Sequence, residues 1–206
     1  MIKFFLLLKI IFLTNFAIAQ ELQSGDIILI SFNCYECRVI ESETNSLFSH
    51  SGVILRGKDN NFYVLQSLGS VSSVTLDQFL KNKRPLSKVS IYRPKDFFNY
   101  TKKEYFELSQ EMVSIFSSKF LGLKFDSDYL WDNVDQNGNE LFYCSEFVAK
   151  FLDDFLSKPT IPYPLSYKKN YQYWFKYFNG HVPEGVLGNS PGSFAEDPRF
   201  EFVFSF

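Results

Sequence analysis

The segment that begins at Cys144 constrains the fold of this chain more than any other part of the sequence. Behind the cysteine, apolar residues recur at helical spacing and define one face: Phe147, Val148, Phe151, Leu152 and Phe155. A helix of this kind has to bury its apolar face against another element. A thiol at its first turn faces unpaired backbone N–H groups and the positive end of the helix dipole, and both favour the thiolate. We therefore expect Cys144 to be a nucleophile; the alternative is a small buried hydrophobic residue.

Residues 1–19 have the pattern of a secretory signal peptide. A short basic start is followed by an almost continuously apolar run over 4–13 and by the small residues of a cleavage site at 17–19. The run is interrupted by Lys9 and is shorter than the roughly 20 residues that span a bilayer. We expect a periplasmic or secreted mature chain over 20–206 with no transmembrane span; an uncleaved anchor is the alternative.

The mature chain has the size of one domain, and it shows no internal repeat and no boundary between domains. Its charges are nearly balanced, with a formal net charge of −2 for the full sequence, so we expect no nucleic-acid partner. Aromatic residues make up 19% of the chain, Phe above all. This excess fits either an apolar core or an apolar substrate groove, and the sequence does not separate the two uses.

Short apolar runs bounded by turns indicate strands in the first half of the chain and at its end. They lie at 27–30, 51–55, 62–65, 89–92 and 199–206. A long helix is indicated over 101–120, where Thr101 and Glu104 form a capping-box pattern and Gly122 follows the last turn. A shorter helix is indicated within 74–80. These elements predict one α+β domain.

A histidine and a glutamine flank the second and third predicted strands, which form a hairpin. His50 immediately precedes the first of them and Gln66 immediately follows the other, so both lie at the same end of adjacent antiparallel strands. The chain has only two histidines, and His181 lies in a Gly/Pro-rich loop without a partner motif. We expect His181 at the surface and His50 to be the base that meets Cys144.

Three short segments together resemble a known family of enzymes. They are Phe48–Val53, Val64–Ser67 and Phe142–Phe147, and the opening Gly25–Ile28 fits the same pattern. They resemble the YiiX/YaeF-like permuted papain-fold enzymes, relatives of the NlpC cell-wall peptidases and of lecithin:retinol acyltransferases. The order is specific, because His precedes the polar residue and Cys comes last, whereas unpermuted thiol peptidases carry the cysteine first. The resemblance covers most of 24–156 and implies a circularly permuted papain-like fold with an antiparallel sheet packed against helices.

Thiol catalysis needs a sulfur nucleophile, a base within roughly 2.6–3.2 Å and a third group that holds the imidazole. Cys144, His50 and Gln66 match these roles. In the resembled family the third position is often acidic, commonly Glu, and an amide does not stabilise an imidazolium as a carboxylate does. Tyr143 is a weaker candidate for contact with the substrate or the oxyanion. Glu146, in the first helical turn, is explained by its favourable interaction with the helix N-terminus.

The sequence and the resemblance together predict an exported thiol hydrolase or acyltransferase. It would cleave an amide or ester through a Cys–His acyl-enzyme mechanism. The partner would be a small amide or ester, a peptidoglycan peptide or a lipid. The alternative is a catalytically degenerate papain-like domain that binds a cell-wall or lipid ligand without turnover, and Gln66 in place of an acid is its main support.

The chain has three cysteines, an odd number for an exported protein. Cys34 and Cys37 are close enough to pair in an oxidising compartment, which would leave Cys144 as an odd thiol, either reactive or paired with another molecule. A redox-active pair with this spacing belongs at a strand-to-helix junction. Because we expect 31–49 to be polar and irregular, we favour a structural disulfide or free thiols; a CxxC redox protein is a third hypothesis.

Two possible metal sites are incomplete. A zinc site from Cys34, Cys37 and His50 would need a fourth ligand. The stretch 133–138 begins like a calcium loop, but its twelfth position is Cys144 where such loops carry a bidentate Glu. We expect no metal and no cofactor.

Overall fold

The structure is a computed structural model that describes residues 22–206. The predicted signal peptide, 1–19, lies outside the described residues. Within 22–206, no helix is both long and apolar enough to cross a membrane.

The described part of the chain is built around a six-stranded sheet with the strand order β4-β3-β2-β1-β5-β8. Its strands are β1 (Ile27–Ile30), β2 (His50–Arg56), β3 (Phe62–Leu68), β4 (Ser70–Thr75), β5 (Ser90–Pro94) and β8 (Phe200–Ser205). All neighbouring strands pair antiparallel. The α+β class and the antiparallel sheet are therefore confirmed. The strand β4 was not predicted.

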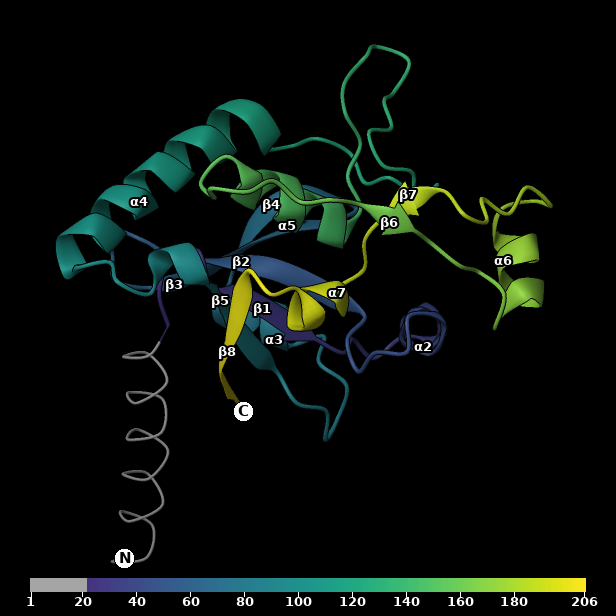
Figure 1. The fold of residues 1–206 in the computed structure, drawn as a ribbon, viewed down its shortest axis with the longest axis horizontal. Helices are drawn as coiled ribbons and strands as arrows, with labels where there is room; N and C mark the ends of the chain where they lie inside the picture. The colour runs from purple at the N-terminus through teal and green to yellow at the C-terminus, as the bar shows by residue number, and fades with distance from the viewer. Residues whose placement is uncertain (1–21) are drawn as a thin grey trace, which may run out of the picture.

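Helices cover one face of the sheet, with α4 and α5 lying side by side above it (Figure 1). They are α4 (Lys102–Ile115), its continuation η2 (Phe116–Phe120) and α5 (Cys144–Asp153). The apolar face predicted for the Cys144 helix is buried here, since Phe147, Val148 and Phe151 are fully buried in the same cluster as Val53. Burying that face fixes the start of α5 against the sheet.

The opposite face carries a second cluster. It includes Ile30 and Ile54 of the sheet, Phe32 from the segment after β1, and Phe79 of α3 (Leu76–Leu80). A 3-10 turn, η1 (Lys95–Phe97), follows β5.

Local capping determines where two of the helices begin. Thr101 accepts a hydrogen bond from the N–H of Glu104 while the Glu104 carboxylate accepts one from Thr101, so the predicted capping box is confirmed. Thr75 caps α3 in the same way, with Gln78 as its partner. Gly122, at φ +87°, follows the last turn of η2.

The prediction that 31–49 is irregular is wrong, because the segment contains the helix α2 (Tyr35–Glu43). Its buried side chains are Cys37, Val39 and Glu41. A buried face that includes a cysteine and a carboxylate shows no apolar periodicity, so the sequence pattern conceals the helix.

A smaller lobe lies beside one end of the sheet, where α6 and α2 are neighbours (Figure 1). It contains β6 (Tyr163–Pro164), α6 (Tyr171–Tyr177) and β7 (Leu187–Gly188). The short helix α7 (Ser193–Glu196) lies instead beside β8, where Phe194 packs in the main core cluster (Figure 1). Glu43 of α2 holds the lobe, because its carboxylate accepts from the N–H groups of Lys169 and Asn170. An aromatic cluster around Tyr167 and Trp174 packs between α2 and the lobe.

Candidate active site

Cys144 is the first residue of α5 and lies against the sheet. Ser67 of β3 donates a hydrogen bond to the carbonyl of Phe142 at 2.6 Å, which holds the chain just before the helix. Backbone N–H groups of Ser51, Ser145 and Cys144 itself face the sulfur. The sulfur thus meets the helix N-terminus, as the sequence predicts, and also the strand β2.

Burial nevertheless keeps this thiol neutral. Removal from water raises the pKa of Cys144 to about 11, and this effect outweighs the hydrogen bonds from the surrounding N–H groups, which lower it. The N–H groups at the helix start favour the thiolate, as expected, but desolvation opposes the charge more strongly in the resting site. Cys144 is a free cysteine.

His50 and Gln66 meet directly. His50 opens β2, and the pairing of Val53 with Leu65 brings Gln66 of β3 onto the same face of the sheet. The Nε2 of His50 lies 2.7 Å from the Oε1 of Gln66. Because a carbonyl oxygen only accepts, this hydrogen bond places the proton on Nε2 and leaves Nδ1 as the basic nitrogen.

The imidazole lies in an apolar setting. The His50 ring stacks on Phe32 with centroids 4.4 Å apart, and Phe79 lies 5.6 Å away. Burial lowers the pKa of His50 to about 4, although the hydrogen bond to Gln66 raises it in part. His50 is therefore a neutral base at neutral pH.

The Cys144 sulfur lies against Ser51, the residue after His50. Ser51 pairs with Leu29 and His50 pairs with Ile30, at the start of β2. Within residues 22–206, the Cys144 sulfur and the His50 ring form no hydrogen bond with each other. Catalytic hydrogen bonds are often long before substrate binds and tighten when it is bound.

Hydrogen bonds with Asn189 hold Tyr143 and Ser145, on either side of Cys144, at the N-terminus of α5. The Tyr143 hydroxyl accepts a hydrogen bond from the N–H of Asn189 at 3.0 Å, and burial raises its pKa above the ordinary value. The Asn189 side chain donates to the carbonyl of Ser145 at 2.9 Å. A contact of Tyr143 with an oxyanion stays a prediction. Asn189 was missed, because an amide in a Gly/Pro-rich loop gives no signal of its contacts.

A small cavity at Cys144 adjoins a larger groove. The cavity, of about 60 Å³, has Cys144, Tyr143 and Ser49 in its wall. The groove, of about 510 Å³, runs along β6 and α7, and Leu165 and Asn189 line both. A carbonyl group can therefore approach the sulfur from the groove.

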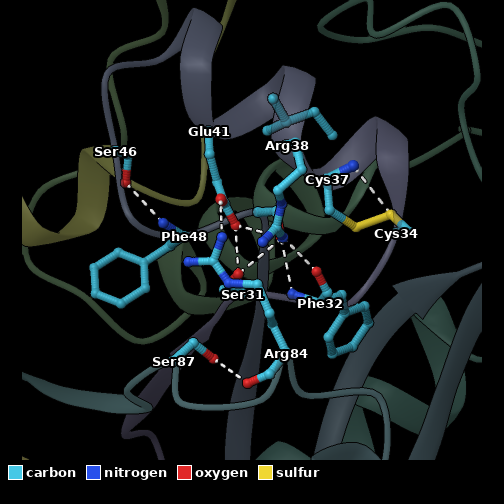
Figure 2. A network of polar contacts seen from close by, with 12 residues as sticks. Ser31, Phe32, Cys34, Cys37, Arg38, Glu41, Ser46, Phe48, Arg84 and Ser87 are labelled. Atoms are coloured by element: carbon cyan, nitrogen blue, oxygen red, sulfur yellow. Dashed lines mark hydrogen bonds and ion pairs between the residues drawn. A yellow bond between two sulfur atoms is a disulfide. The ribbon is translucent and has the colours of Figure 1, made fainter.

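Cys34 and Cys37 form a disulfide at the start of α2, as Figure 2 shows. Cys34 is exposed and is the N-cap of the helix, and its sulfur accepts from the N–H of Cys37 at 3.0 Å. The pair therefore does lie between a strand and a helix, contrary to our expectation. In the disulfide neither sulfur is available as a zinc thiolate.

An arginine links this helix to the histidine side of the sheet (Figure 2). Arg38 donates to the carbonyl of Phe32, to the Ser31 hydroxyl at 2.9 Å and to Glu41 at 2.8 Å. Since Phe32 stacks on His50, α2 also sets the position of the imidazole.

A cluster of carboxylates surrounds an ammonium group beyond the first turn of α5. Oxygens of Asp132, Glu140 and Glu146 lie within 4.8 Å of one another. Lys150 forms ion pairs with all three, with 3.0 Å to Glu146. The cluster holds the loop before Cys144 to the helix. His181 is exposed, as expected, and its ring contacts the carbonyl of Asn179 at 3.2 Å.

Comparison with known proteins agrees with this arrangement. Residues 21–204 match the family of permuted papain-like amidase enzymes, YaeF/YiiX, C92. The crystal structure of the metalloprotein YiiX from Escherichia coli O157:H7 superposes with a TM-score of 0.75 at 19% identity, over 90% of this chain and 98% of that one. No curated protein matches the chain. The chain therefore belongs to the permuted papain-like amidases of the YaeF/YiiX, C92 family and is a cysteine amidase-type hydrolase.

Proposed function

We propose that the protein is an exported thiol hydrolase or acyltransferase that acts on an amide or ester through Cys144 and His50. The observation that carries the proposal is the hydrogen bond of 2.7 Å between His50 and Gln66, in a site where the residue after His50 contacts the Cys144 sulfur. It supplies an oriented base next to Ser51, the residue whose backbone N–H faces the Cys144 sulfur. The apolar run at the start of the sequence supports export.

In the proposed reaction the Cys144 sulfur attacks the substrate carbonyl while His50 Nδ1 takes the thiol proton. The C–N or C–O bond then breaks, His50 returns the proton to the leaving group, and the acyl group stays on Cys144 as a thioester. Water or another acceptor takes the acyl group in the second half. Gln66 keeps the ring oriented by accepting from Nε2 throughout.

The members of the family are described as amidases, which cleave amide bonds. Which amide or ester this protein cleaves is proposed here from its expected location. A peptidoglycan peptide or a lipid-linked amide or ester fits an exported location. The solved YiiX structure is named a metalloprotein. In residues 22–206, Lys150 already occupies the carboxylate cluster and Cys34 is in a disulfide, so neither group fits a metal ion and no proposed step uses one.

The test is turnover and acylation of the purified mature protein with an amide substrate that releases a fluorescent amine. We expect Cys144→Ala and His50→Ala each to abolish amine release, and the mass of the adduct on Cys144 to identify the acyl group. His181→Ala is the matched control, because this exposed imidazole should be dispensable. Activity like that of the wild type in either site variant would reject the mechanism.

A binding module without turnover is the second candidate, and one observation favours it. The raised pKa of Cys144, about 11, and the lowered pKa of His50, about 4, leave both groups neutral in the resting site. This candidate predicts that Cys144 never becomes acylated and that Cys144→Ala binds ligand as the wild type does.

A further inference from the structure

The small cavity at Cys144 has an apolar wall that comes from several distant segments. Apart from Cys144, its main lining side chains are Ile40, Tyr129, Tyr143, Leu165, Tyr167 and Trp174. They belong to α2, to the loop before α5 and to the lobe that contains α6. A group bound to the sulfur would therefore lie against aromatic rings and aliphatic side chains.

The charged group of this wall and one of its tyrosine hydroxyls are hydrogen-bonded to protein partners. Glu43 is the only charged residue among the described lining residues, and its carboxylate accepts from Asn170 at 2.9 Å and from Trp174 at 3.3 Å. The Tyr129 hydroxyl donates to Glu36 at 2.8 Å. Two buried uncharged polar atoms of lining residues, the Tyr167 hydroxyl and Asn189 Oδ1, have no hydrogen-bond partner in the described part of the chain. The cavity thus offers no free charge to a ligand, and a charged group would lose its hydration without compensation.

The volume limits what fits. About 10–15 Å³ of such space holds one water. The cavity of about 60 Å³ therefore takes roughly four to six non-hydrogen atoms. A long fatty chain does not fit, whereas a short acyl group does. The groove of about 510 Å³, which shares Leu165 and Asn189 with the cavity, has room for the larger remainder of a substrate.

We infer that the cavity beside Cys144 is the acyl subsite and that it admits a short, uncharged acyl group, while the amine side of the substrate lies in the groove. The inference rests on the proposed function. The acyl carbon bonds to the Cys144 sulfur and remains there after the amine leaves. The rest of the acyl group therefore lies in the cavity that adjoins the sulfur.

The test is a series of coumarin amides with unbranched acyl groups from acetyl to decanoyl. Burial of each methylene should raise kcat/KM by about fourfold until the cavity is full. Beyond roughly six acyl atoms the value should fall. An aminohexanoyl amide, which adds a positive charge at similar length, should be turned over at least tenfold more slowly than the hexanoyl amide.

Two variants change the cavity in opposite directions. Leu165→Ala widens it, so the optimum should move to acyl groups about three carbons longer. Ile40→Phe narrows it, so the optimum should move toward acetyl. Leu86→Ala is the control, because the Leu86 side chain is fully exposed and lines neither cavity. Urea denaturation of each variant separates a change of cavity from a loss of folding.

The outcomes separate this inference from the proposed function. Acylation of Cys144 with a rate that is flat or still rising at decanoyl overturns the acyl subsite and leaves the amidase mechanism in place. A preference for the aminohexanoyl over the hexanoyl amide also overturns the acyl subsite. So does a rate that depends on the length of the amine group, in a series with one fixed acyl group, but not on the length of the acyl group. If iodoacetamide labels Cys144 but neither an amide nor the matching ester of any length acylates it, both proposals are rejected.

Discussion

The carboxyl group of Glu146, two residues after Cys144, should make the stability of this protein depend on pH. Its side chain is fully buried. Burial raises the pKa of Glu146 to about 7, although Lys150 at 3.0 Å and the N–H of Asp132 at 2.9 Å lower it in part. The second carboxyl oxygen, Oε2, has no hydrogen-bond partner. The ionised form is therefore disfavoured in the folded protein.

The size of the effect follows from the two pKa values. Folded Glu146 keeps its proton until about pH 7, whereas the unfolded chain releases it near the ordinary value of 4.5. A carboxyl group with a raised pKa contributes stability that is complete below pH 4.5 and is lost as the pH rises to about 7. The difference corresponds to roughly 3 kcal/mol.

The perturbation is Glu146→Gln, which keeps the shape and the acceptor for Asp132 but does not ionise. Relative to the wild type, the free energy of unfolding of the variant should rise by roughly 3 kcal/mol between pH 4.5 and pH 8. Urea unfolding at stepped pH measures it. Glu104→Gln is a matched control: capping hydrogen bonds lower the pKa of Glu104, so its contribution is present at higher pH and is lost on acidification.

A constant difference between Glu146→Gln and the wild type, within about 0.5 kcal/mol over the whole pH range, would refute the reasoning. It would mean that Lys150 compensates the carboxylate fully and that Glu146 is ionised in the folded protein. A difference that grows toward acidic pH would have the wrong sign and lead to the same conclusion.

Three further results are expected. Gln66→Glu places a carboxylate beside His50 and should move the acidic limb of the pH–rate profile to higher pH, because an anion raises the pKa of the ring. Cys34→Ser/Cys37→Ser should keep turnover and lower the free energy of unfolding by about 2 kcal/mol, as thermal unfolding with and without reductant would show; lost turnover would support redox chemistry. Gly188→Ala should destabilise by about 1–3 kcal/mol in urea, because a Cβ there would lie 2.6 Å from the nearest side-chain atom.

The sheet and its main helices could be predicted because each carries a local signal. The apolar run 27–30 is buried at every position in β1. The hairpin that presents His50 and Gln66 follows from two such runs and the turn between them. The capping box at Thr101 depends on residues three apart, and it forms as predicted.

The elements that were missed have no such signal. In β4 only Val71 is buried, because the strand lies at the edge of the sheet, and an edge strand of alternating Ser and Val does not look apolar. The cavity at Cys144 depends on contacts between segments more than a hundred residues apart, such as Glu43 with Asn170. No sequence window contains both members of such a pair.

Electrostatics accounts for the glutamine that stands where the resembled family often has an acid. The imidazole of His50 is buried between Phe32 and Phe79, and the thiol of Cys144 is buried as well, so the resting site holds two neutral groups. A carboxylate at position 66 would add an uncompensated buried charge, which costs several kcal/mol unless it is paired. Gln66 orients the ring without that penalty. In the proposed mechanism, the positive charge on His50 would therefore form only during attack, as the new bond to the carbonyl carbon makes the Cys144 thiol a stronger acid. A site of this kind should react slowly with simple alkylating agents and faster with acyl substrates that fill the cavity.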